Sequence, residues 1–332
     1  MTLSVVIHGA GRMATAHAAA LARRRDIRVI AISNRGRKRG EPLAARLGVP
    51  LFATLREAIV ATRPDIVVVA TAPVDHADAL ECVRLHDVSV LCEKPVVASA
   101  EQFERLVDAF VASSRKFWVN FPLRLNARVA GIRAEIAAMG ANLRQVTITS
   151  HYPRPHSYYE HGASDPQVMF GGVIWTQAIH EIDLAVHLIG EFRVSESLFG
   201  HAHHGLAVED EASYRGLSAA GVAVSGIAST APDLPFCSQV VFEGAAAACG
   251  FRRCHARFRF LPKGRTFDRL VHLYDQYTGR VTPLSTVWNE CVDSYTSGRL
   301  SVLDGASTLA THRTVEAVYR TARALHPAQS PR

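Results

Sequence analysis

Short apolar segments alternate with longer amphipathic segments along the first third of the chain. The apolar segments are rich in Val and Ile and predict buried strands at residues 3–7, 27–32, 66–70, 90–92 and 117–121. The segments between them have the composition and periodicity of helices, at residues 15–25, 41–47, 55–61, 77–86 and 100–113. Strands and helices that alternate in this way, with short connections, predict a parallel, doubly wound α/β sheet over residues 1–122.

The pattern then changes, because strands begin to follow one another. A helix is expected at 126–139 and a strand at 145–152. Residues 195–260 read as a series of strands, which ends in the alternating segment 255–260. Such a series predicts an α+β domain with a mostly antiparallel sheet, of which one face is exposed to solvent or pairs with another subunit.

The composition is that of an ordinary globular protein, with 48% hydrophobic and 20% charged residues among 332. No apolar run is as long as a membrane span and the amino terminus lacks the pattern of a signal peptide, so we expect a cytoplasmic protein without a membrane partner. The formal charge of +7 suits an anionic cofactor or substrate, but no module typical of nucleic-acid binding is present. The six cysteines form no CxxC pair, and we expect reduced thiols.

A glycine-rich turn follows the first strand. Residues 9–14 read Gly-Ala-Gly-Arg-Met-Ala, a G-x-G-x-x-A pattern between a predicted strand and a predicted helix. Glycines there permit a tight turn and let the backbone approach a pyrophosphate at the amino end of the helix. The sequence therefore predicts a dinucleotide-binding (Rossmann) domain at residues 1–122 and a substrate-binding and oligomerisation domain at residues 123–332. The segment 287–324 is expected to be helical, with a last helix at about 305–325 that packs back on the first domain.

The end of the second strand is expected to contact the adenosine ribose of a dinucleotide. Residues 33–39 read Ser-Asn-Arg-Gly-Arg-Lys-Arg and offer no carboxylate for a ribose diol. Arg35, beside the small polar Asn34, can instead bind a 2′-phosphate through paired hydrogen bonds. This favours NADP over NAD, although dual use stays open and the segment can also be a solvated loop that happens to be basic.

The strand at 90–92 ends in Glu93-Lys94-Pro95. Proline stops the strand and holds Lys94 in an extended or turn conformation. Lys94 therefore lies at the carboxyl end of a strand, where open α/β sheets bind their ligands. The alternative is a solvated lysine at a strand end. His76 also follows a strand end, and it can face the cofactor or cap the next helix.

A second polar stretch lies in and before a helix predicted at 178–189. Its polar residues are spaced by four, three and four, and are therefore expected to share one face: Thr176, His180, Asp183 and His187. That face can consist of interior hydrogen bonds, an exposed surface or a metal site. We disfavour the metal because no further ligand cluster is evident. The histidine-rich run 201–204 is expected to be a surface loop.

Several of these stretches together resemble the Gfo/Idh/MocA family of nicotinamide-dependent oxidoreductases, over nearly the whole chain. The matching elements are Gly9–Ala14, Glu93-Lys94-Pro95, Gly171-Gly172, and His180 with Asp183. The resemblance implies a Rossmann domain followed by a domain with a large open, mainly antiparallel sheet, through which members form homodimers or homotetramers. It places Lys94 beside the nicotinamide and the substrate, implies a cis bond before Pro95, and gives His180 the proton of the reacting hydroxyl or carbonyl.

One departure from the family pattern is Thr176, at a position where many members carry an aspartate and where threonine cannot take up a proton at neutral pH. Residues 173–180 and 154–159 are similar to the branch that acts on sugars and nucleotide sugars. The resemblance implies hydride transfer between nicotinamide C4 and a hydroxyl or keto carbon of a sugar, cyclitol or sugar derivative. Either Lys94 or His180 can be the proton acceptor, and the alternative is a non-catalytic NADP-binding regulator or scaffold of the same fold.

Lys94 and His180 are the expected catalytic residues, and no metal is expected. The expected cofactor-binding residues are Gly9, Gly11, Arg12, Met13, Asn34, Arg35, Thr71, Ala72, Pro73, His76, Glu93 and Lys94. The expected substrate-binding residues are Lys94, Arg124, Tyr152, Trp175, Thr176, Gln177 and His180. Trp175 and Tyr152 can equally belong to the core or to an interface, since cores and pockets both recruit aromatic residues.

Overall fold

The structure of the chain is a computed structural model that describes residues 2–113, 115–159, 169–245, 247–254 and 282–324. The chain forms two compact units. The first contains Met1–Pro122 and Pro283–Leu309, and the second contains Leu123–Thr282 and Ala310–Arg332. Residues 283–309, which the sequence analysis assigns to the second domain, thus belong to the first unit.

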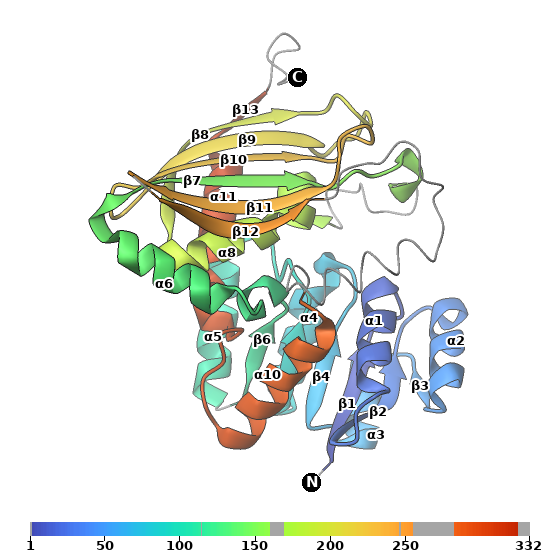
Figure 1. Cartoon of the computed structure of the whole chain (residues 1–332). Helices are drawn as coiled ribbons and strands as arrows, with labels where there is room; N and C mark the ends of the chain where they lie inside the picture. The colour runs from blue at the N-terminus through green and yellow to red at the C-terminus, as the bar shows by residue number, and fades with distance from the viewer. Residues whose placement is uncertain (1, 114, 160–168, 246, 255–281, 325–332) are drawn as a thin grey trace. The chain divides into compact units, whose positions relative to one another are not determined.

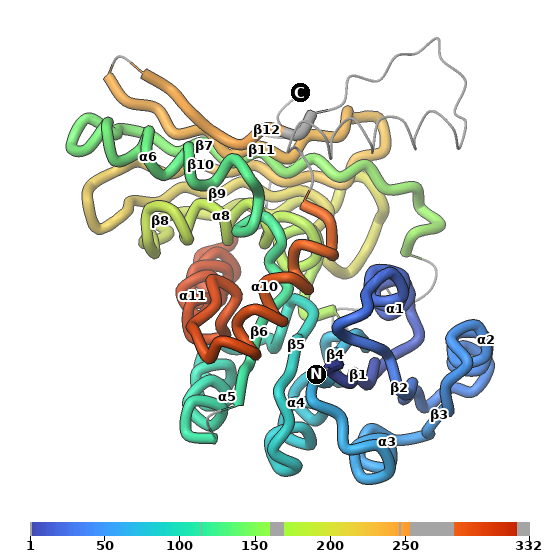
Figure 2. Tube along the Cα trace, turned by 60° about the horizontal axis from the view of Figure 1, so that its bottom comes forward, coloured from blue at the N-terminus to red at the C-terminus, as the bar shows by residue number. Residues whose placement is uncertain are grey.

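The first unit is built on a parallel sheet of six strands in the order β3-β2-β1-β4-β5-β6 (Figure 1). The strands are β1 (Leu3–His8), β2 (Ile27–Ser33), β3 (Leu51–Phe52), β4 (Ile66–Val69), β5 (Ser89–Cys92) and β6 (Phe117–Val119). The helices are α1 (Arg12–Leu21), α2 (Arg37–Leu47), α3 (Leu55–Thr62), α4 (His76–Leu85), α5 (Ala100–Ser113) and α10 (Leu284–Ser297). In Figure 2, α3, α4 and α5 lie along one face of the sheet, and α1 and α10 along the other.

The doubly wound parallel sheet predicted for this part of the chain is confirmed. Its central strands β1, β4 and β5 are mostly apolar because helices cover both of their faces. Val6, Val68 and Leu91, for example, are completely buried. Thr54 caps α3 with its side chain and forms a capping box with Glu57, which explains where that helix begins.

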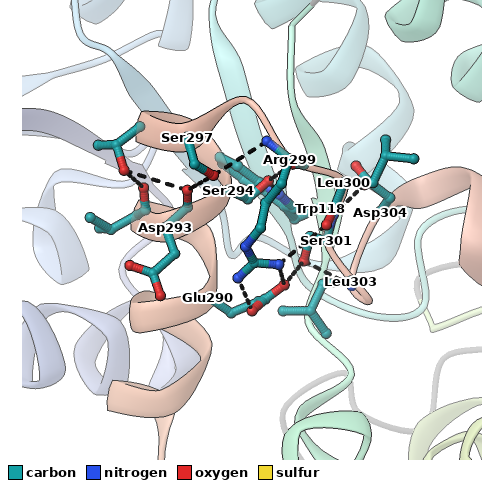
Figure 3. Close-up of polar contacts among 12 residues, drawn as sticks. Trp118, Glu290, Asp293, Ser294, Ser297, Arg299, Leu300, Ser301, Leu303 and Asp304 are labelled. Atoms are coloured by element: carbon teal, nitrogen blue, oxygen red, sulfur yellow. Dashed lines mark hydrogen bonds and ion pairs between the residues drawn. The ribbon is translucent and has the colours of Figure 1, made fainter.

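The segment that follows α10 protects the β6 edge of this sheet (Figure 3). Trp118 of β6 forms an antiparallel bridge with Asp304, and its indole N–H donates to Ser294 Oγ of α10 at 3.4 Å. Arg299 binds Glu290 of α10 through both terminal guanidinium nitrogens, at 3.0 and 2.6 Å. Because an unpaired edge strand exposes backbone N–H and C=O groups, the returning segment shields the sheet from further pairing.

The second unit is built on a sheet of seven strands in the order β12-β11-β7-β10-β9-β8-β13. The strands are β7 (Leu143–His151), β8 (Phe192–Gly200), β9 (Glu211–Ser218), β10 (Ala223–Ser229), β11 (Cys237–Gly244), β12 (Ala248–Cys254) and β13 (Ala322–Ala324). Neighbouring strands are antiparallel except for the pairs β7–β10 and β8–β13. The helices are α6 (Val129–Met139), α8 (Ile179–Ile189) and α11 (Gly305–Arg320), of which α11 begins in the segment assigned to the first unit. The predicted large, mainly antiparallel sheet is confirmed.

Several predicted boundaries are wrong. Helix α1 spans Arg12–Leu21 rather than 15–25, and α2 begins at Arg37, so that three residues of the basic segment form its first turn. The expected C-terminal helix ends at Arg320, and Ala322–Ala324 instead adds a short parallel strand to β8. The expected strand at 255–260 lies outside the described residues. Within the described part of the chain, no helix combines the length and apolar character needed to cross a membrane.

Candidate functional site

The glycine-rich turn connects β1 to α1 and requires glycine at its first position. Gly9 has φ +117°, and a Cβ there would lie 2.5 Å from the carbonyl oxygen of Ala70 at the end of β4. Gly11 is the N-cap of α1 and makes no side-chain cap, so the N–H groups of Arg12 and Met13 receive no capping side chain. A Cβ at Gly11 would meet no described protein atom within 4 Å. The turn therefore leaves room for an anion at the positive end of a helix.

The end of β2 combines buried polar residues with exposed cations. Beside this strand end, at the end of β1, burial lowers the pKa of His8 to about 4, so its ring is neutral near pH 7. Its Nδ1 lies 3.1 Å from Ser33 Oγ. Asn34 is half-buried and donates from Nδ2 to the carbonyl oxygen of Gly36 at 2.7 Å, whereas Arg35 is exposed. The following first turn of α2 contains cations and no acid.

The loop after β4 is held by a histidine rather than exposing one. His76 is completely buried at the start of α4, and burial lowers its pKa. Its Nδ1 lies 2.9 Å from the carbonyl oxygen of Pro95, and its Nε2 lies 3.3 Å from that of Thr71. A neutral imidazole has one N–H, and the shorter contact assigns it to Nδ1 as donor to Pro95. His76 therefore joins two strand-end loops, and that it also faces the cofactor stays a prediction. Ala72 and Pro73 stand in the same loop.

The turn that carries Lys94 follows β5 directly. Glu93 is buried and accepts hydrogen bonds on Oε1 from His17 Nε2 at 2.9 Å and from Asn120 Nδ2 at 2.7 Å. Burial opposes ionisation of Glu93, but these donors and the charge of Lys94 outweigh it and lower the pKa of the carboxyl. Lys94 itself is half-buried, and the Lys94–Pro95 peptide bond is cis, as the resemblance implies.

His180 stands in the first turn of α8, which begins after a π-helical turn, Ile174–Ala178. Thr176 lies in that π-helical turn and donates from Oγ1 to the carbonyl oxygen of Gly172 at 2.7 Å. Because the π-helical turn changes the spacing, the expected single polar face is divided. Asp183 is completely buried, while Thr176 and His180 are half-buried. The described residues contain no group of three or more His, Cys, Asp or Glu side chains able to hold a metal.

The glycine pair Gly171-Gly172 has a packing explanation. A Cβ at Gly172 would collide with the carbonyl oxygen of Glu209, and one at Gly171 with the hydroxyl of Tyr319. The buried carboxylate of Glu209 accepts from the backbone N–H of Gly172 at 2.9 Å and of Ile174 at 3.1 Å, and from Tyr319 Oη at 2.6 Å. The pair therefore lets a buried carboxylate hold the start of the helix that carries His180.

Arg124, which the sequence analysis assigns to the substrate, is instead committed to a buried ion pair. Its Nε and Nη2 donate to the two oxygens of Asp183 at 2.8 and 2.6 Å, and both side chains are completely buried. Thr311 Oγ1 also donates to Asp183, at 2.8 Å. Burial raises the pKa of Asp183 and Arg124 opposes this rise. A bidentate pair with no exposed surface serves the fold of the second unit rather than solvent or ligand.

Three further residues assigned to the substrate are mostly inside the second unit. Tyr152 is buried and donates from Oη to Glu181 at 2.6 Å, and the ring of Trp175 stacks on Tyr319 with centroids 6.1 Å apart. Gln177 is buried and accepts from Arg154 Nη2 at 2.9 Å. Of the two alternatives for the aromatic residues, these contacts favour the core.

His187 and the histidine-rich run 201–204 make structural contacts within the second unit. Burial, Arg124 and Arg133 lower the pKa of His187 to about 4, and its Nε2 accepts from Arg133 Nη2 at 2.9 Å. The run 201–204 lies in a turn as expected, but His204 is buried. The backbone N–H of His204 donates to Asp210 Oδ2 at 2.8 Å, which anchors the turn to the start of β9.

Comparison with known proteins identifies the first domain. Residues 3–121 match the model of Gfo/Idh/MocA, an oxidoreductase family with an NAD-binding Rossmann fold. The Rossmann domain of this chain is thus similar to the NAD-binding domain of that family. Inositol 2-dehydrogenase from Rhizobium meliloti (strain 1021) is 28% identical over 222 residues, which are 66% of this chain and 64% of that protein. The match thus spans a little less than two thirds of the length of that curated relative.

Two solved structures extend the likeness to the whole fold. The WlbA dehydrogenase from Bordetella pertussis, solved in complex with NADH and UDP-GlcNAcA, superposes with a TM-score of 0.83 at 18% identity, over 96% of this chain and 95% of that one. A myo-inositol dehydrogenase from Corynebacterium glutamicum ATCC 13032 superposes with a TM-score of 0.77 at 17% identity, over 97% of both chains. The predicted fold class, an α/β Rossmann domain followed by an α+β domain with a large open, mainly antiparallel sheet, is confirmed.

Sequence analysis missed several buried residues that support the candidate site residues within each unit. His17, Asn120 and Glu181 form hydrogen bonds with the candidate site residues Glu93 and Tyr152. Trp288 contacts His17, and Glu209 accepts from the backbone N–H of Gly172. One signal was present, since His17 falls on the buried face of an alanine-rich helix, where a polar side chain needs a partner. The partners themselves are distant in sequence.

Proposed function

We propose that the chain is an NAD(P)-dependent dehydrogenase that interconverts a secondary alcohol and a ketone on a cyclitol or sugar. The observation that carries the proposal is the pairing, in one unit, of the Gly9–Ala14 turn at the end of β1 with Lys94 at the end of β5. Parallel sheets bind ligands at the carboxyl ends of their strands, so both features serve one cofactor. The name of the curated relative supports a cyclitol such as inositol as substrate.

The residues of the Gly9–Ala14 turn fit a dinucleotide. Gly11 leaves space where a Cβ would stand, and the uncapped N–H groups of Arg12 and Met13 suit a pyrophosphate. The bound nicotinamide would supply the acceptor or donor of the hydride. Lys94 would stabilise negative charge on the substrate oxygen, and His180 would exchange its proton. Thr176 donates its hydroxyl to a backbone carbonyl and would not serve as a base.

The exposed cations after β2 support a preference for NADP. Cations in the first turn of a helix oppose its dipole, which costs roughly 0.3–1 kcal/mol each, and α2 begins with Arg37, Lys38 and Arg39. A phosphate bound there would relieve that repulsion. Arg37 already pairs with Glu41 at 2.8 Å, so Arg35 and Asn34 are the residues that we assign to the 2′-phosphate and the ribose.

The cofactor assignment is tested by fluorescence titration with NADPH and NADH. NADPH should bind more tightly, and Arg35→Ala should weaken NADPH binding by about tenfold while leaving NADH binding unchanged. Arg28→Ala, at the opposite end of β2, is the matched control and should change neither affinity. Preference for NADH, or an equal loss for both dinucleotides, would show that the basic segment is merely a solvated surface.

The reaction is tested with a panel of cyclitols, sugars and sugar derivatives, beginning with myo-inositol. Lys94→Met and His180→Asn should each lower turnover by about a hundredfold or more while NAD(P)H still binds. His187→Gln, on the same helix as His180, should retain turnover because His187 is neutral and held by Arg133. Near-native turnover in both catalytic variants would refute the assigned roles.

The rival proposal is a regulator or scaffold that binds NADP without chemistry, which Thr176 in place of an acid favours. It predicts cofactor binding with no change of redox state across the whole panel.

For either function, we propose assembly into a homodimer or homotetramer through the second-unit sheet. Leu217 and Ile227 support this, because they are exposed on neighbouring strands of that sheet. Light scattering of the purified protein tests the assembly.

A further inference from the structure

A chain of buried hydrogen bonds stands behind Lys94 and is not used by the proposed chemistry. The indole N–H of Trp288 donates to His17 Nδ1 at 3.2 Å, and His17 Nε2 lies 2.9 Å from Glu93 Oε1. Asn120 Nδ2 donates to the same carboxylate oxygen at 2.7 Å. Trp288 and His17 are completely buried, and Asn120 and Glu93 nearly so. All four residues belong to the first unit.

Trp288 determines which nitrogen of His17 carries the proton. An indole nitrogen is only a donor, so Nδ1 of His17 must accept, and a ring that accepts at Nδ1 is the neutral tautomer with its proton on Nε2. That Nε2–H points at Glu93 and donates to it. If His17 carried a proton on Nδ1, that N–H would face the indole N–H of Trp288, and two donors would meet without an acceptor in a site that has no exposed surface. The carboxylate of Glu93 therefore receives a neutral donor and keeps its own charge.

The backbone around Lys94 is held on both sides. Glu93 donates its backbone N–H to the carbonyl oxygen of Val69 at 2.9 Å, and the carbonyl oxygen of Pro95 accepts from His76 Nδ1 at 2.9 Å. The residue before Lys94, Glu93, is therefore tied to α1 through His17. The residue after it, Pro95, is tied to α4 through His76. Helix α1 is the one whose amino end the proposed cofactor would use.

We propose that His17, with its tautomer set by Trp288, is a positioning residue that keeps Glu93 a fixed anion and so holds the ammonium group of Lys94 in place. This inference rests on the proposed function, because it assigns Lys94 to the substrate oxygen. It adds that the same helix which would bind the pyrophosphate also positions the proposed catalytic cation. His17 itself touches neither substrate nor cofactor in this scheme.

Two other titratable groups near Glu93, His76 and Cys92, carry no charge. His76 interacts with Glu93 electrostatically, but burial lowers its pKa and keeps it neutral. Cys92, the preceding residue, has a pKa raised well above its usual value by burial and by Glu93, and stays a thiol. Lys94 brings a cation to the carboxylate, and its charge lowers the pKa of Glu93 together with His17 and Asn120.

The charge of Lys94 can be measured without any substrate. The chain contains four lysines, Lys38, Lys94, Lys116 and Lys263, so reductive ¹³C-methylation of the free protein yields a small set of lysine resonances, which single Lys→Arg variants assign. Glu93→Gln keeps the acceptor oxygen but removes the charge, and should lower the titration midpoint of Lys94 by about one pH unit. The midpoints of the other lysines should not move.

Variants of His17 separate positioning from mere packing. Glutamine can present an N–H near the position of Nε2, so His17→Gln should keep the midpoint of Lys94 within a few tenths of a pH unit of the native value, roughly the precision of the method. His17→Leu leaves a buried carboxylate with fewer donors, which favours its protonation, and should reproduce the shift of Glu93→Gln. If His17→Leu does not fold, Glu93→Gln and His17→Gln decide the question alone.

Kinetics complete the test once a substrate is known. Glu93→Gln and His17→Leu should lower kcat by about tenfold or more, with KM and NAD(P)H affinity little changed, and His17→Gln should restore turnover. An unmoved Lys94 midpoint in Glu93→Gln, or equal shifts in both His17 variants, would overturn the inference. A protein that shows the Lys94 shift but turns over no substrate would instead refute the proposed function and leave the anchoring of Lys94 supported.

Discussion

Replacing Arg124 by methionine would remove the cation from a completely buried ion pair. Arg124 and Asp183 share two hydrogen bonds, of 2.8 and 2.6 Å, and neither side chain reaches solvent. Water therefore cannot replace the lost donors. Breaking such a pair by removal of one partner costs about 3–5 kcal/mol of stability, because a buried charge is left uncompensated.

The two halves of the pair should not be equivalent. After Arg124→Met, the carboxyl of Asp183 can escape the cost of burial by taking up a proton, and Thr311 still donates to it. After Asp183→Asn, the guanidinium of Arg124 cannot lose its proton at any accessible pH. We therefore expect Asp183→Asn to be the more destabilising change at pH 5, even though asparagine is the closer match in shape.

The pH dependence has a definite sign. Burial already raises the pKa of Asp183, and Arg124 opposes that rise, so Arg124→Met should raise it further. A carboxyl whose folded pKa lies above its unfolded value contributes stability below the unfolded pKa and loses it as pH rises through the folded pKa. The deficit of Arg124→Met should therefore grow from pH 5 to pH 8, by about 1.4 kcal/mol for each unit of added shift. The deficit of Asp183→Asn should not grow over this range, because asparagine does not titrate.

Urea unfolding at pH 5, 6.5 and 8, followed by circular dichroism, would measure these deficits. Hydrogen exchange of the α8 amides would show that the second unit is the one that opens. Equal and pH-independent deficits for the two variants would refute the reasoning. A stable Arg124→Met protein with a strongly raised KM would refute it differently, since Arg124 would then serve the substrate as the sequence analysis expects.

Two further predictions concern packing and acid stability. Gly172→Ala should destabilise the second unit by about 2 kcal/mol or more, because its Cβ collides with the backbone of Glu209. Gly131→Ala, in the open on α6, should stabilise it by about 0.5–1 kcal/mol, and thermal melts of both variants would compare them. His8 has a folded pKa of about 4, below its usual value of 6.5, so its contribution to stability is present above pH 6.5 and is lost as pH falls toward 4. His8→Asn should flatten that acid limb in urea titrations, and an unchanged limb would remove His8 from the explanation.

Local patterns were enough to predict the parts of the site that depend on consecutive residues. The Gly9 turn and the Glu93-Lys94-Pro95 turn are each defined by a strand, a special backbone position and the start of the next element, all within a few residues. Alternation of strands and helices then predicts that the sheet is parallel and doubly wound. The sequence therefore predicted the position of Lys94, just after the end of β5, and the structure confirms that position.

Pairings across long sequence separations were not predictable in the same way. Glu93 meets His17 at a separation of 76 residues, and His17 meets Trp288 at 271. Neither composition nor periodicity carries the identity of such partners, because each side chain reads locally as one buried residue on an ordinary element. Arg124 illustrates the cost: its charge suggested a ligand, while its partner Asp183 was considered only as a member of a helical face.

The helical-face expectation failed for a different physical reason. Four polar residues spaced by four, three and four align on a regular α-helix, but Ile174–Ala178 forms a π-helical turn, which widens the turn and shifts Thr176 relative to His180. The local sequence gives no cue for that insertion. The buried carboxylate of Glu209, which accepts the N–H groups of Gly172 and Ile174, stabilises the entry to the turn from a distant loop.

Each proposed catalytic residue is adjacent in sequence to a buried carboxylate. Burying a carboxylate costs stability, so we expect it only where the carboxylate helps to position the neighbouring catalytic residue. Glu93 adjoins Lys94, and Glu181, which accepts from Ser150, Tyr152 and Ser238, adjoins His180. Apolar side chains of similar volume often replace buried ionic groups without loss of stability. The buried pair of Arg124 with Asp183 of α8 allows a test of stability against positioning. The double variant Arg124→Met with Asp183→Leu should restore stability without restoring the ion pair between Arg124 and α8. If kcat then remains low while unfolding is native-like, the pair positions His180; if both recover, it serves stability alone.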